Sequence, residues 1–114
     1  MSLIYKILPR AEWEAALAAG RFEGSAIDRK DGFIHFSAGD QWSETLRLHF
    51  AGQRDLVLVG VEADDLGEAL KWEPSRGGAL FPHLYGPLQL TAVRWVKPLR
   101  LDPDGRHVFP KLEE

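Results

Sequence analysis

The chain has 114 residues, 45% of them hydrophobic, which is room for one domain because most domains run to about 100–150 residues. Its 14 basic and 17 acidic side chains give a formal net charge of −3, which argues against bulk nucleic-acid binding. The absence of cysteine excludes disulfides, thiolate nucleophiles and Cys-ligated metal sites. We therefore expect one domain spanning residues 1–114.

Nothing in the sequence indicates a membrane segment. The longest apolar run, Leu56–Val61, is far shorter than the ~18–20 residues that a membrane-spanning helix needs. The first ten residues lack a basic region followed by an apolar one, so no signal peptide is expected. We expect a soluble, cytoplasmic protein that is a monomer or a small homo-oligomer.

The first half of the chain predicts two strands and two helices. Residues 3–8 alternate as a strand does, and a helix should follow from Pro9 to Gly20. An Asp-Gly turn at residues 31–32 precedes a second strand over residues 33–36. Ser37 is then expected to cap a second helix that ends at Gly52.

The second half predicts strands. Residues 56–61 are nearly all apolar and should form a central strand covered on both faces, and residues 69–73 another strand. Residues 81–87 contain two prolines, which predicts a rigid extended segment rather than a regular central strand. Residues 88–101 alternate along one long strand. The fold class is therefore α+β, with two N-terminal helices packed on a mostly antiparallel sheet of about five or more strands.

Polar residues with chemical potential gather in two short segments. His35 lies at the end of a predicted strand, where the following helix start offers unpaired N–H groups to an anion. His83 and Tyr85 alternate across Leu84, so they should project to the same side of a proline-stiffened segment. A structural role as hydrogen-bonded strand and loop residues is the alternative for each.

Glu73 ends a predicted strand and is expected near Arg76 and His83. A carboxylate there would stabilise a developing cation or orient a ribose, or simply pair with Arg76 at the surface. The four histidines show no metal-ligand spacing, so no metal is expected.

Several motifs together resemble the DUF952 family of small bacterial and plant proteins of unknown function, over residues 3 to 101. The motifs are Ile4-Tyr5-Lys6-Ile7, the Trp13 helix, Asp31-Gly32-Phe33-Ile34-His35-Phe36-Ser37 with Gln41, Lys71-Trp72-Glu73, and Phe81-Pro82-His83-Leu84-Tyr85-Gly86-Pro87. The family in turn is similar to the ADP-ribosyltransferase fold, which implies an NAD cofactor.

That second resemblance implies roles for individual residues. His35 matches the residue that binds the ribose of NAD, and Ser37 and Gln41 are placed beside it in the cofactor site. Tyr85 is the candidate for the aromatic ring that stacks on nicotinamide, and Arg76 for a phosphate contact. His35, His83, Tyr85 and Glu73 form the implied catalytic set, although Glu73 precedes Tyr85, which is the reverse of the usual order.

The sequence leaves three functions open. The first is binding of NAD or an ADP-ribose-like nucleotide, with ADP-ribosyltransferase or phosphotransferase-like chemistry. The second is a non-catalytic module that binds a small anion or a protein, and the third is a metal-dependent hydrolase.

Overall fold

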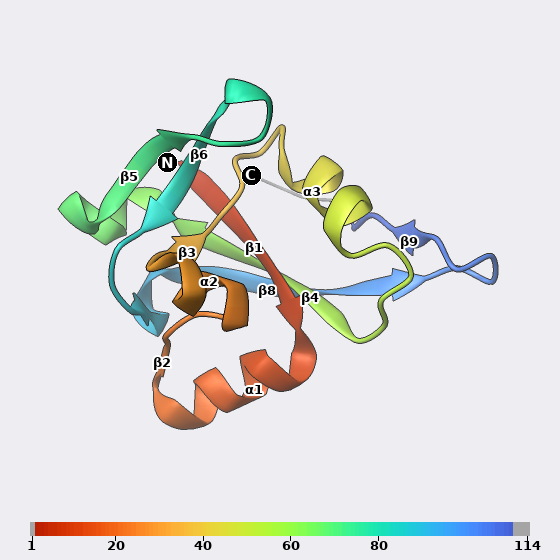
Figure 1. The fold of residues 1–114 in the computed structure, drawn as a ribbon. Helices are drawn as coiled ribbons and strands as arrows, with labels where there is room; N and C mark the ends of the chain where they lie inside the picture. Colours follow the sequence, from red (N-terminus) through yellow and green to blue (C-terminus); the bar gives the residue numbers. More distant parts are fainter. Residues whose placement is uncertain (1, 111–114) are drawn as a thin grey trace.

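The computed structural model describes residues 2–110, which form an α+β arrangement of three α-helices and nine strands (Figure 1). The helices are α1 (Arg10–Ala19), α2 (Ala26–Asp31) and α3 (Trp42–His49), with 3₁₀ helices η1 (Ala63–Ala69), η2 (Arg76–Gly78) and η3 (Leu90–Ala92). The strands are β1 (Leu3–Pro9), β2 (Arg21–Phe22), β3 (Ile34–His35), β4 (Leu56–Glu62), β5 (Leu70–Pro74), β6 (Leu80–Leu84), β7 (Leu88–Gln89), β8 (Val93–Leu101) and β9 (His107–Val108).

The strands pair antiparallel in three sheets, in the orders β1-β4-β8-β9, β3-β6-β5 and β2-β7. The predicted antiparallel pairing is confirmed, but the strands are divided among sheets. A two-bond backbone bridge joins the larger two sheets: the N–H of Tyr5 donates to the Ser37 carbonyl and that of Ser37 to the Tyr5 carbonyl, each at 2.8 Å. The segment after β3 therefore runs beside the free edge of β1.

Strand β4 is central, as its sequence predicted, because it lies between β1 and β8 and all seven of its residues are buried. Val57, Val59 and Val61 face one apolar cluster, whereas Leu56 and Leu58 face a second one. This division explains why the strand is a continuous apolar run with no polar face.

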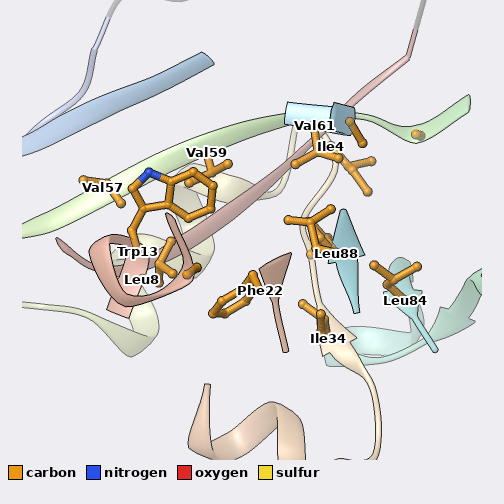
Figure 2. Close-up of a cluster of buried hydrophobic side chains, with 14 residues drawn as sticks. Ile4, Leu8, Trp13, Phe22, Ile34, Val57, Val59, Val61, Leu84 and Leu88 are labelled. Carbon is orange, nitrogen blue, oxygen red and sulfur yellow. The ribbon is translucent and has the colours of Figure 1, made fainter. Parts of the chain in front are cut away.

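The first cluster joins α1 to both larger sheets. Figure 2 shows the Trp13 ring, carried by α1, lying against Val57 and Val59, while Ile34 and Leu84 approach from β3 and β6. The α3 side of the four-stranded sheet holds the second cluster, in which Leu46 is fully buried. None of the helices within residues 2–110 has the length and apolar content needed to cross a membrane.

The N-terminal half differs from the prediction at its helices. Helix α1 ends as predicted, with Gly20 in the left-handed conformation at φ 85°. Helix α2 was missed, since the only element predicted between the first helix and residue 33 was an Asp-Gly turn at residues 31–32. Ser37 is not a helix cap: α3 begins at Trp42 with Gln41 at the cap position, because the backbone of Ser37 is used in the bridge to Tyr5.

The proline-containing segment also differs from the prediction, because β6 is the middle strand of its sheet. A proline has no backbone N–H, so inside a sheet it leaves one position of the hydrogen-bond ladder without a donor. At Pro82 this position lies just beyond the end of β3, and the Pro82 carbonyl still accepts from the N–H of Phe36 at 3.0 Å. The single strand expected over residues 88–101 is interrupted by η3. The loop at residues 75–79 contains the short helix η2.

Candidate functional site

The pairing of β3 with β6 places two histidines side by side. His35 and His83 are register partners, and their rings are 5.5 Å apart, centroid to centroid, with an edge-to-face angle of 71°. Their neighbours Ile34 and Leu84 point the other way, into the first apolar cluster. Strand alternation therefore gives this small sheet one apolar face and one face that carries imidazoles.

A buried ion pair between Lys6 and Asp28 lies next to His35. The Lys6 ammonium, on β1, lies 2.9 Å from Oδ2 and 3.1 Å from Oδ1 of Asp28, on α2. Asp28 is 1% exposed and also accepts from the backbone N–H groups of Ser25 at 2.9 Å and His35 at 3.1 Å. The ion pair thus connects β1, α2 and β3.

The ionisation of this pair follows from its contacts. Burial opposes the charge on Asp28, but hydrogen bonds from His35 and Lys6 outweigh it and lower the pKa of this carboxyl to about 2. Burial lowers the pKa of Lys6, against the opposing attraction of Asp28. Asp28 is therefore a fixed negative charge beside His35.

His35 is held by carboxylates at both ring nitrogens. Its Nδ1 lies 2.6 Å from Oδ1 of Asp28, and its Nε2 lies 2.9 Å from Oδ2 of Asp31. Ionised carboxylates only accept hydrogen bonds, so Nδ1 of His35 donates to Asp28. The ring of His35 is therefore oriented by Asp28, with Asp31 beside its second nitrogen.

His83 is held at one nitrogen only among residues 2–110. Its Nδ1 lies 2.8 Å from Oε1 of Glu73, and the Tyr85 hydroxyl donates to the same oxygen at 2.7 Å. The hydrogen bonds from His83 and Tyr85 lower the pKa of Glu73, and the carboxylate in turn raises the pKa of Tyr85. The ionised Glu73 assigns the proton of a neutral His83 ring to Nδ1 and leaves Nε2 as an acceptor.

An aromatic side chain covers one side of both histidines. The Phe33 ring stacks on His83 at 4.1 Å between centroids, and it lies 4.6 Å from His35 and 5.2 Å from Tyr85. These contacts fix the orientation of the imidazoles by packing as well as by hydrogen bonding. Phe33 was predicted only as a strand residue and was not among the predicted site residues.

The two histidines open onto a cavity of 430 Å³. Its lining is Lys6, Ile7, Ile27, His35, Phe36, Thr45, His49, Phe50, Ser75, Arg76, Phe81 and His83. Five of these twelve side chains are basic types and none is a carboxylate. Arg76 donates to the Thr45 hydroxyl at 3.3 Å and lies over the Phe81 ring at 4.9 Å. The cavity therefore combines positive charge, two hydroxyls and aromatic walls.

The structure brings together most of the predicted site residues, but only some of them line the cavity. His35, His83 and Arg76 line the cavity. Glu73 and Tyr85 contact His83 and Phe33 instead of lining it, so their influence on a ligand there passes through His83.

Ser37 and Gln41 are not among the lining residues. The Ser37 hydroxyl lies 3.1 Å from that of Thr45, which does line the cavity. The Gln41 amide accepts from the N–H of Ala38 and donates to the Leu80 carbonyl, each at 2.8 Å. Gln41 thus fastens the start of α3 to β6.

Sequence reasoning missed the buried ion pair. One signal was available in β1: Lys6 falls between Ile4 and Leu8 on the face that alternation predicts to be buried. The second was the Ser25-x-x-Asp28 spacing, which is a helix-start pattern with an acidic third residue. A lysine on a buried face requires a carboxylate partner.

The structure contains no group of three or more His, Cys, Asp or Glu side chains placed to hold a metal ion, within residues 2–110. Asp28, Asp31 and Glu73 instead contact the histidines and Lys6.

Similarity to other proteins is strong at the level of family and fold. The crystal structure of the protein CC0527 from Caulobacter crescentus is 62% identical, covers 94% of each chain and has a TM-score of 0.89. Its solution NMR structure is 63% identical, covers 93% of this chain and 91% of that one, and has a TM-score of 0.82. No curated protein matches the chain. The family model described as "Protein of unknown function (DUF952)" matches residues 7–96, and the chain therefore belongs to the DUF952 family, as its motifs predicted.

Proposed function

We propose that the cavity beside His35 and His83 binds a small phosphate-bearing ligand of the nucleotide type, with NAD and ADP-ribose as the specific candidates. The observation that carries the proposal is the charge of the lining: Lys6, His35, His49, Arg76 and His83 are basic types, and no carboxylate lines the cavity. A phosphate placed there meets donors from several elements, and Arg76 is the lining cation that has no carboxylate partner within residues 2–110, whereas Lys6 is paired with Asp28.

The cavity also offers contacts for the rest of a nucleotide. Its volume of 430 Å³ lies within the roughly 300–1,000 Å³ typical of small-molecule sites. Arg76 supplies a planar fork of donors, and Phe36 and Phe81 supply apolar ring surface for a base or a sugar. The similarity to the ADP-ribosyltransferase fold inferred from the motifs assigns the ribose contact to His35, and it makes transfer of ADP-ribose or of a phosphoryl group the reaction to test.

Calorimetric titration of the purified protein with ADP-ribose, ADP and adenosine tests the binding proposal. We expect ADP-ribose and ADP to bind, and adenosine to bind at least about tenfold more weakly because it lacks phosphate. Arg76→Gln should weaken both phosphate-bearing ligands. Arg94→Gln is the matched control, since Arg94 pairs with Asp65 and does not line the cavity.

Two results separate the proposal from its alternative. Equal affinity for ADP-ribose and inorganic phosphate would identify a non-catalytic site for small anions. Binding of none of these ligands at millimolar concentration would refute the nucleotide proposal.

A further inference from the structure

The two histidines differ in the number of nitrogens that the protein occupies. Both nitrogens of His35 contact carboxylates, Asp28 and Asp31. His83 contacts Glu73 through Nδ1, and no partner within residues 2–110 contacts its Nε2. His83 is 5% exposed and lines the cavity, so little of its ring is open to bulk solvent.

We propose that His83 is the general base of this pocket and that Glu73 is its positioning residue. The inference rests on the proposed binding of NAD. Nε2 of His83 takes the proton from a water molecule whose oxygen attacks C1′ of the nicotinamide-bearing ribose. The new C1′–O bond forms as the C1′–N bond to nicotinamide breaks, and the electron pair of the broken bond neutralises the pyridinium nitrogen. The products are ADP-ribose, nicotinamide and a proton.

The surroundings of His83 fit this role in two respects. Glu73 accepts from Nδ1 and so keeps the lone pair on Nε2, and it stabilises the imidazolium that forms when Nε2 takes the proton. Phe33 stacks on the ring at 4.1 Å and holds its plane. Glu73 itself remains in contact with solvent, since 38% of its side chain is exposed.

His35 has a different part in the reaction. Asp28 accepts from its Nδ1, and Asp31 lies 2.9 Å from its Nε2. These contacts hold its ring at the wall of the pocket, where it orients the ribose. A pocket with one histidine anchored by carboxylates and one with a free acceptor nitrogen can position a ligand and activate water at the same time.

The first test uses the protein without ligand. Two-bond ¹H–¹⁵N correlation spectra distinguish the two tautomers of a neutral imidazole. We expect the proton of His83 on Nδ1, and we expect Glu73→Gln to increase the fraction of the other tautomer. A wild-type spectrum with the proton on Nε2 would overturn the assignment of His83 as a base, whatever the ligand.

The second test measures nicotinamide release from NAD by chromatography, alongside NAD affinity by calorimetry. His83→Gln should lower the rate by about 100-fold or more at saturating NAD, as loss of a general base does. Glu73→Gln should lower the rate by about tenfold through the orientation of His83. His107→Gln and Glu68→Gln, away from the cavity, are the matched controls and should keep the wild-type rate.

The two measurements separate failure of this inference from failure of the binding proposal. NAD that binds but releases no nicotinamide, or releases it equally fast in His83→Gln, overturns the role of His83 and leaves the binding site intact. NAD that does not bind overturns both.

Discussion

His35 and His83 face each other across one rung of the β3–β6 ladder, yet carboxylates from different elements hold them. Asp28 and Asp31, which hold His35, belong to α2, whereas Glu73, which holds His83, belongs to β5. The site thus depends on α2, which sequence analysis missed, and on the buried charge pair between Lys6 and Asp28.

Asp28→Asn should strongly destabilise the fold. Removing one partner of a buried ion pair leaves the other charge unpaired, which costs about 3–5 kcal/mol. Urea unfolding measures the loss. Asp31→Asn is the matched control, because Asp31 is half-exposed and contacts only the outer nitrogen of His35. Its effect should be small. Equal losses in the two variants would contradict the structural importance of the Lys6 pair.

The same carboxyl predicts an acid-sensitive stability. The pKa of Asp28 is lowered from 3.8 to about 2 in the folded protein, so the unfolded chain binds the proton more readily. The stabilisation is fully present above the unfolded pKa and is lost as the pH falls through the folded value. A shift of this size corresponds to about 2 kcal/mol. Urea midpoints between about pH 5 and pH 2 should fall more steeply for the wild type than for Asp28→Asn. Parallel profiles would contradict the assignment.

Gly60→Ala should destabilise the four-stranded sheet. A Cβ at this position of β4 would lie 2.6 Å from Cε2 of Trp95, the residue opposite on β8. Overpacking of this kind costs about 1–3 kcal/mol. Gly39→Ala is the control, since its Cβ would meet only Tyr5, at 3.8 Å. Adding Trp95→Leu to Gly60→Ala should recover part of the loss, and thermal unfolding measures all three. An additive double variant would contradict the proposed clash.

Tyr5→Phe should keep or increase stability. The Tyr5 hydroxyl is buried without a hydrogen-bond partner within residues 2–110, and the Tyr5 ring lies 6.3 Å from that of Trp42 and 5.8 Å from that of Trp95, between centroids. Removing an unsatisfied buried hydroxyl is worth about 1 kcal/mol. Chemical unfolding of the variant checks the sign. A clear loss of stability would show that the hydroxyl has a partner, such as an ordered water.

Sequence patterns predicted the elements whose signals are local. The strands β1, β4 and β5 were predicted because apolar alternation and β-branched residues mark them, and the end of α1 because Gly20 adopts φ 85°. Strand β6 was missed as a central strand because Pro82 lacks a backbone N–H, and the energetic cost of that loss depends on which strand lies opposite. Strand β3 ends before the position where this N–H would be needed, and only the folded structure reveals this.

The sequence predicted the histidines of the candidate site but not the buried ion pair that holds His35. His35, His83 and Glu73 stood out as polar residues at strand ends, and the structure brings them together. Lys6 and Asp28 are 22 residues apart in sequence, so their pairing follows from tertiary packing. The misassignment of Ser37 has the same origin, because its backbone pairs with Tyr5 on a distant strand.

The bridge between Tyr5 and Ser37 has a practical consequence for ligand discovery. It joins the four-stranded sheet, which carries Lys6, to the segment that follows His35 in the three-stranded sheet. Residues of both sheets therefore line the cavity. The cavity exists only when both sheets are in place, and unfolding destroys it. A compound that occupies it must therefore raise the melting temperature in proportion to the logarithm of its concentration once the site is saturated. Melting curves recorded across a metabolite library would find such compounds without any assumption about the reaction.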